Sequence, residues 1–141
     1  MKIASYKATR SGAAGLFNII IRWWRASKYS HNELVFADGM CASSSWMDGG
    51  IRFKQIELNP EKWDIVELDN KFSEEKARQW FANNLGSKYN LLLIVSFVLP
   101  FLAKWASKRG YVCSTSIAES LGFKESWRIY PALLHEWVVN N

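Results

Sequence analysis

Two extended runs of sequence, residues 31–36 and 41–46, flank Asp38-Gly39, and this arrangement leaves the chain few alternatives. An Asp-Gly pair between two such runs is a strong signal for a β-hairpin. Two more runs typical of strands follow at residues 50–57 and 63–68, and the Asn59-Pro60 pair separates them. The sequence therefore predicts an antiparallel sheet with Asp38-Gly39 at the tip of one hairpin.

The length of the hairpin loop decides which side chains share a face of the sheet. A two-residue loop places Ala37 opposite Met40. Because side chains alternate between the two faces of a strand, one face then carries His31, Glu33, Ser44 and Trp46. We therefore expect a polar cluster on this face of the hairpin.

The rest of the chain shows helical patterns. A helix begins after Ser73, which suits an N-cap position and is followed by two glutamates, and a later one opens at Cys113 and stops at Gly122. Pro100 is expected to break an apolar helix. The predicted helical segments are residues 13–26, 73–86, 90–107, 113–122 and a last one that begins at Pro131. With 141 residues, of which 49% are hydrophobic, the chain is expected to form one α+β domain over residues 1–141.

The first thirty residues carry an unbalanced positive charge, with six basic residues and no acidic residue before Glu33. This N-terminal third could contact the phosphates of a membrane surface, or it could be an ordinary solvated basic face. Nucleic acid is not the expected partner. The start of the chain lacks the pattern of a signal peptide, and the longest apolar run, Leu91–Ala103, is shorter than the roughly 20 residues that span a bilayer. The expected compartment is the cytoplasm. The gene could also be phage-encoded or prophage-encoded, and a phage-borne protein could still reach the cell wall through lysis or injection.

The two cysteines, Cys41 and Cys113, have neither the pattern of a disulfide framework nor the spacing of zinc ligands. Cys113 is expected at the start of a helix, where unpaired N–H groups and the helix dipole lower the pKa of a thiol. His31 could then act as its base, with Glu33 or Ser44 holding the other ring nitrogen.

Each of these residues also has an ordinary structural interpretation. A lone cysteine near a helix start is often a small buried hydrophobic residue, and a lone strand histidine is often only hydrogen-bonded. Cys41 is a weaker nucleophile candidate, because the predicted register places it on the face opposite His31 near the hairpin tip. His135 is a weaker base candidate, because it belongs to the terminal helix.

An ordered set of short motifs resembles the circularly permuted papain-like amidases of the NlpC superfamily. This family includes the YiiX-like amidases and is related to lecithin:retinol acyltransferase. The histidine strand precedes the cysteine helix in it, as it does here. The motifs run in order over most of the chain, at residues 29–36, 38–39, 43–45, 48–52, 63–66, 86–90 and 113–114.

The resemblance implies a small, barrel-like antiparallel sheet packed against helices, with Cys113 as nucleophile, His31 as base and then acid, and no cofactor or metal. The family's third polar residue usually lies on the strand after the histidine strand, which points to Ser44 or a neighbour. A carboxylate orients imidazole more strongly than a hydroxyl, so we predict Glu33 first and Ser44 second. The family's Tyr-Asp pair is Tyr89-Asn90 here, and Tyr89 is expected to line the substrate site.

The function expected from the sequence is therefore a cysteine hydrolase, an amidase or peptidase that cleaves an amide or related acyl bond through an acyl-enzyme. The Cys113 backbone N–H is expected to contribute to the oxyanion hole. A peptide, a peptidoglycan peptide and a lipid acyl group all remain candidate substrates. The alternatives are a thiol acyltransferase or other lipid-acting enzyme, and an inactive module that binds a membrane or nucleic acid. The oligomeric state stays open.

Overall fold

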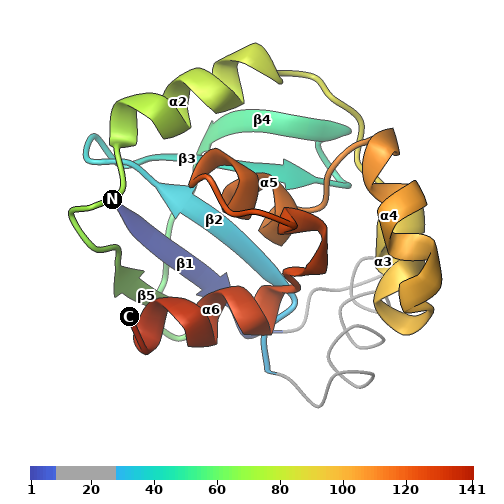
Figure 1. Cartoon of the computed structure of the whole chain (residues 1–141). Coiled ribbons are helices and arrows are strands. Elements are labelled where there is room, and N and C mark those ends of the chain that lie inside the picture. The colour runs from blue at the N-terminus through green and yellow to red at the C-terminus, as the bar shows by residue number, and fades with distance from the viewer. Residues whose placement is uncertain (9–27) are drawn as a thin grey trace.

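The fold is built on a five-stranded antiparallel sheet with the strand order β4-β3-β2-β1-β5 (Figure 1). The computed structural model describes residues 1–8 and 28–141, so the helix predicted over residues 13–26 lies outside the described residues. The strands are β1 (Lys2–Tyr6), β2 (His31–Val35), β3 (Met40–Ser45), β4 (Gly50–Gln55) and β5 (Trp63–Glu67). The α+β class and the antiparallel sheet are confirmed, and the sheet is open, with β4 and β5 at its edges.

Strand β1 was not predicted from the sequence, although it lies between β2 and β5. Its residues after Lys2 are all buried, because Ile3 faces the main core while Ala4 and Tyr6 face a second, smaller cluster. A strand that is buried on both faces shows no alternation between polar and apolar residues, so the usual sequence signal is missing.

The predicted hairpin is confirmed, but its register is wrong by one residue. Leu34 lies opposite Ala42, and the Phe36 N–H donates to the Met40 carbonyl at 2.9 Å, so the loop has three residues. Gly39 adopts the left-handed conformation, with φ of 81°, and Asp38 does not. This is the conformation of a three-residue loop that ends in a left-handed glycine, whereas the two-residue loop needs positive φ at both central positions.

The shifted register moves residues of β3 to the other face. Ser44 faces the helices, where its hydroxyl donates to the Tyr111 carbonyl at 3.0 Å, and Trp46 is exposed. Cys41 lies opposite Val35 and therefore on the same face as His31. The predicted grouping of Ser44 and Trp46 with His31, and the placement of Cys41 away from it, are both wrong.

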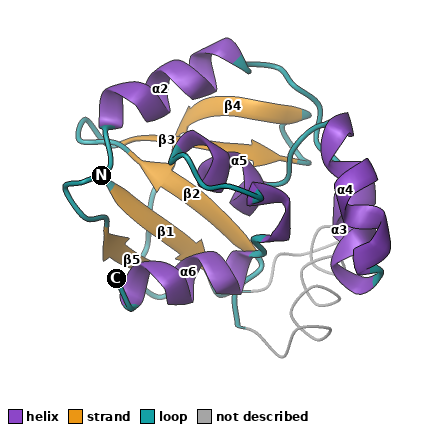
Figure 2. Cartoon of the chain, viewed as in Figure 1, coloured by secondary structure: helices purple, strands orange, loops and turns teal. Residues whose placement is uncertain are grey.

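Three helices cover one face of the sheet: α2 (Glu74–Asn83), α5 (Cys113–Ser120) and α6 (Pro131–Val139) (Figure 2). Their buried side chains join those of the strands in the main core, which contains Ile3, Leu34, Ala42, Ile51, Ala77, Phe81, Ile117, Leu134 and Val138. The predicted start of α2 is confirmed, since the Ser73 hydroxyl accepts the Lys76 N–H at 3.3 Å. The helix ends at Asn83, so Leu85 of the predicted segment lies beyond it and is exposed.

The segment from residue 91 to 109, which we call the helical excursion, leaves the sheet and returns to α5. It consists of α3 (Leu91–Val98), a 3₁₀ turn (Pro100–Leu102), α4 (Ala103–Ala106) and a second 3₁₀ turn (Ser107–Arg109). Another 3₁₀ turn (Ser126–Arg128) precedes α6. The predicted break at Pro100 is confirmed. No helix among residues 1–8 and 28–141 has both the length and the apolar character needed to cross a bilayer.

Candidate active site

Cys113 is the first residue of α5, and its side chain is only 3% exposed. The ladder between β2 and β3 ends at the Leu34–Ala42 pair, and beyond it the start of α5 replaces strand contacts. The Ser44 N–H donates to the Ser116 hydroxyl at 3.3 Å, and the Ser43 hydroxyl donates to the Asn32 carbonyl at 2.8 Å. The two strands therefore separate where the cysteine meets the sheet.

Two backbone N–H groups, those of Asn32 and Ser114, hydrogen-bond the Cys113 sulfur. Burial raises the pKa of this thiol. The adjacent His31 ring and the two N–H groups lower it by more than burial raises it, so the pKa lies below the ordinary value. The first N–H groups of a helix have no acceptor within the helix, so they are available to a negative sulfur. The local structure thus favours the thiolate form.

His31 begins β2 and lies beside the Cys113 thiol, close enough for a hydrogen bond and a strong charge interaction. Its Nε2 atom is 2.7 Å from Glu33 Oε1, which leaves Nδ1 as the ring nitrogen available to the sulfur. Burial lowers the pKa of His31, but the Cys113 thiolate and the Glu33 carboxylate outweigh burial and raise that pKa to about 9. Cys113 and His31 are therefore stabilised as a thiolate–imidazolium pair.

Glu33 is completely buried and holds the imidazole from the side away from the sulfur. Arg52 on β4 binds both of its oxygens, with Nη1–Oε2 and Nη2–Oε1 distances of 2.7 and 2.6 Å. Burial raises the pKa of Glu33, but the hydrogen bonds from Arg52 and His31 bring it below the ordinary value. Asp48 in turn accepts from Arg52 Nε at 2.9 Å.

Arg52 was not predicted as a site residue, although it belongs to one of the motifs that carry the family resemblance. The correct hairpin register would have found it, because Arg52 lies opposite Ser43 and thus on the face of Glu33. The structure therefore brings together Cys113, His31, Glu33 and Arg52. It places Ser44 on the opposite face of the sheet, where its hydroxyl has a different partner.

Tyr89 is half-buried and close enough to Cys113 for the thiolate to affect it. Burial and the negative sulfur both raise the pKa of its hydroxyl well above 10, so this group stays protonated. Asn90, the neighbour of Tyr89, has a structural role. Its side chain accepts the Leu93 N–H at 3.0 Å and donates to the Ala106 carbonyl at 2.7 Å, which ties the ends of the helical excursion together.

The remaining cysteine and histidine lie outside this arrangement. Cys41 is buried in the smaller cluster, and burial raises the pKa of its thiol to about 11. His135 on α6 belongs to a separate network, in which its Nδ1 and Nε2 atoms are each 2.9 Å from an oxygen, of Ser5 and of Tyr29 respectively. Neither residue contacts Cys113 in the described part of the chain.

Among residues 1–8 and 28–141, no group of three or more His, Cys, Asp or Glu side chains could hold a metal ion. The chemistry that this arrangement allows is nucleophilic attack by sulfur with proton transfer through imidazole. Comparisons with models of protein families, with curated proteins and with solved structures gave no match for this chain.

Proposed function

We propose that the protein is a cysteine hydrolase, an amidase or peptidase that uses Cys113 as nucleophile and His31 as general base and acid. The observation that carries the proposal is the contact between the Cys113 thiol, at a helix start, and an imidazole whose other nitrogen is held by a buried carboxylate. A thiolate–imidazolium pair with a third orienting group is the arrangement that activates sulfur for acyl transfer.

In the proposed reaction, the Cys113 thiolate attacks a carbonyl carbon and forms a C–S bond. N–H groups at the start of α5, including that of Cys113, stabilise the oxyanion. The imidazolium of His31 gives its proton to the leaving amine as the amide bond breaks. Neutral His31 then takes a proton from water, the hydroxide attacks the thioester, and the sulfur leaves as the thiolate.

Glu33 is proposed as the third member of the site, in preference to Ser44. It fixes the ring through Nε2 and stabilises the positive imidazolium that forms with the thiolate. Arg52 is proposed to hold the Glu33 carboxylate in place through its two hydrogen bonds. Tyr89 is proposed to line the path of the substrate, because it is close to the sulfur and keeps its hydroxyl proton.

The finer fold assignment is part of the same proposal, namely a permuted papain-like arrangement of the NlpC type. Its support is the chain order, in which the histidine strand β2 precedes the cysteine helix α5, and the packing of α5 against an antiparallel sheet. Candidate substrates are a peptide, a peptidoglycan peptide or a lipid acyl group. Transfer of the acyl group to an alcohol or amine is the second candidate, favoured by the apolar helical excursion directly before Cys113.

The first experiment is thiol labelling as a function of pH, read by intact mass. Iodoacetamide is expected to label Cys113 with a midpoint well below pH 9, and the His31→Gln variant is expected to shift that midpoint upward. Cys41→Ala is the matched control, since removal of this buried thiol leaves the profile unchanged. Preferential labelling of Cys41, or a Cys113 midpoint near 9, would overturn the proposal. With any substrate found by screening acyl compounds, Cys113→Ala is expected to abolish hydrolysis.

A further inference from the structure

The helical excursion carries apolar side chains that face outward from the molecule. Leu91, Val95 and Leu99 are spaced four residues apart along α3 and its C-cap, and all three are exposed. Phe101 and Trp105 continue the exposed series, with exposed fractions of 78% and 52%. A run of large exposed apolar residues on one segment is typical of a surface that contacts another partner.

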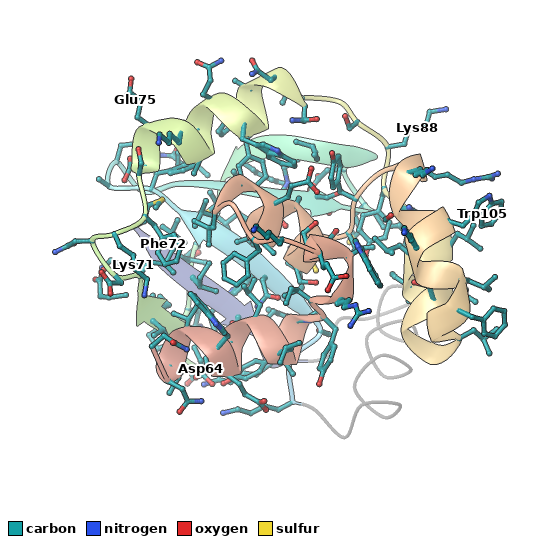
Figure 3. All side chains as sticks on the ribbon, viewed as in Figure 1. Asp64, Lys71, Phe72, Glu75, Lys88 and Trp105 are labelled. Carbon is teal, nitrogen blue, oxygen red and sulfur yellow. The ribbon has the colours of Figure 1, made fainter. Side chains whose placement is uncertain are left out.

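Basic residues frame these apolar side chains. Between residues 76 and 118 the sequence has no acidic residue. Four exposed basic residues lie in or next to the excursion, and no ion pair in the described part of the chain involves them: Lys88, Lys104, Lys108 and Arg109. The Arg109 guanidinium stacks on the Trp105 ring at 4.0 Å. Lys88 and Trp105 project from the same side of the molecule (Figure 3).

We propose that the helical excursion is a docking surface for an anionic lipid membrane. Helices that lie in the membrane interface combine an apolar face with Trp or Phe and with Lys or Arg beside it. The positive charges would lie at the level of the headgroup phosphates, and Phe101 and Trp105 would enter the boundary with the acyl chains. The excursion would rest on the bilayer, since α3 has eight residues and α4 has four, which is too short to span it.

Charge favours lipid over a second copy of the chain as the occupant of this surface. Two copies that meet through the excursion would bring four positive charges against four, whereas an anionic bilayer neutralises them. The inner side of the excursion has its own packing, in which Leu93, Ala106 and Val112 form a buried cluster. The exposed residues are therefore not needed to hold the excursion on the protein, and they can be changed without unfolding it.

The test measures cosedimentation with vesicles, which requires no activity at Cys113. Full-length protein is expected to bind phosphatidylcholine vesicles that contain phosphatidylglycerol, and to bind pure phosphatidylcholine vesicles much more weakly. Phe101→Ser is expected to weaken binding roughly tenfold. Lys104→Glu together with Lys108→Glu is expected to weaken it on the order of 25-fold or more at low salt.

Matched controls change residues of similar exposure elsewhere. Val139→Ser on α6 controls for Phe101, and the pair Lys62→Glu with Lys124→Glu controls for the two lysines; both are expected to bind as the wild type does. Equal binding of the excursion variants and their controls would overturn the proposal, because other basic residues would then carry the interaction. Absence of binding to the anionic vesicles would overturn it as well. The proposal would also be overturned if Phe101→Ser dissociated a dimer and left vesicle binding unchanged, since the surface would then be a subunit contact.

Discussion

The Glu33 carboxylate is fully buried, and three short hydrogen bonds compensate for its lost hydration. Two come from Arg52 and one from His31. A buried charge is tolerated when charged partners surround it. The removal of one charge of such a set leaves the remaining buried charges without full compensation. Glu33 therefore links the stability of the sheet to the charge of the candidate site.

We predict that Glu33→Gln has two separable effects. The free energy of unfolding is expected to fall by about 3 kcal/mol, because Arg52 loses the buried one of its two counter-charges and keeps only Asp48. The pH midpoint of Cys113 labelling is expected to rise by roughly one unit, because the imidazolium loses a stabilising carboxylate. Urea unfolding and labelling by iodoacetamide measure the two quantities.

Asp48→Asn is the matched control for this prediction. It removes the outer partner of Arg52 at 2.9 Å and leaves the contact between His31 and Glu33 in place. Its labelling midpoint is expected to stay at the wild-type value while stability falls by a smaller amount. If Glu33→Gln lowers stability but does not move the midpoint, Glu33 is a structural residue only.

At the level of elements, the pairing of His31 with Glu33 could be predicted from the sequence, while that of Glu33 with Arg52 could not. Residues two apart on a strand share a face whatever the register, so the first pair follows from spacing alone. The second pair depends on the hairpin loop, where one additional residue moves every later side chain of β3 to the other face. Asp38-Gly39 suits both loop lengths, and the sequence does not distinguish them.

The position of α5 is a second feature that the sequence could predict only in part. The helix start at Cys113 follows from the local pattern and is confirmed. The separation of β2 and β3 that lets Cys113 reach His31 comes from contacts such as Ser44 with Tyr111, residues far apart in the sequence. Secondary structure could thus be predicted for most described elements, and their contact at the site required the fold.

Gly110 connects the helical excursion to α5, and we predict that its replacement disturbs the site. It has φ of 129°, and a Cβ atom there would lie 2.4 Å from the Lys88 carbonyl oxygen. Gly110→Ala is expected to lower the free energy of unfolding by about 3 kcal/mol and to slow labelling of Cys113. Gly39→Ala is the control: its φ is also positive, but nothing lies within 4 Å of the added atom, so a loss of about 1 kcal/mol is expected. If urea unfolding shows the same decrease in the free energy of unfolding for both variants, the close approach of Gly110 to Lys88 is not what requires glycine there.

Over the whole molecule, two histidines are held in opposite charge states. His31 is favoured as imidazolium, as described above. His135 lies in a chain of hydrogen bonds that runs from Asn32 through Ser5 to its Nδ1 atom. Tyr29 donates its own proton to Asp64, which lies next to α6 in Figure 3, so the Tyr29 oxygen accepts from Nε2. Burial lowers the pKa of His135, which favours the neutral ring.

These charge states determine how stability depends on pH. The raised pKa of His31 stabilises the folded state below pH 6.5, and this contribution is lost as the pH rises toward about 9. The lowered pKa of Cys113 acts in the opposite direction: its contribution is present above 9.0 and is lost as the pH falls toward the folded pKa. Between 6.5 and 9 the two changes cancel, because folding only moves a proton from the thiol to the imidazole.

Below pH 6.5 the cancellation ends, and we predict a loss of stability that two residues produce together. The unfolded chain protonates His135 there and keeps the Cys113 proton, whereas the folded chain resists protonation at both positions. Proton uptake on unfolding should therefore increase as the pH falls from about 7.5 to about 5.5, so the free energy of unfolding should decrease over this range. Urea unfolding at closely spaced pH values measures it. Cys113→Ala is expected to reduce the proton uptake and so to flatten this pH dependence. Cys41→Ala is expected to leave it unchanged, because burial raises the pKa of that thiol. Identical slopes for the two cysteine variants would mean that Cys113 is a neutral thiol in the folded protein.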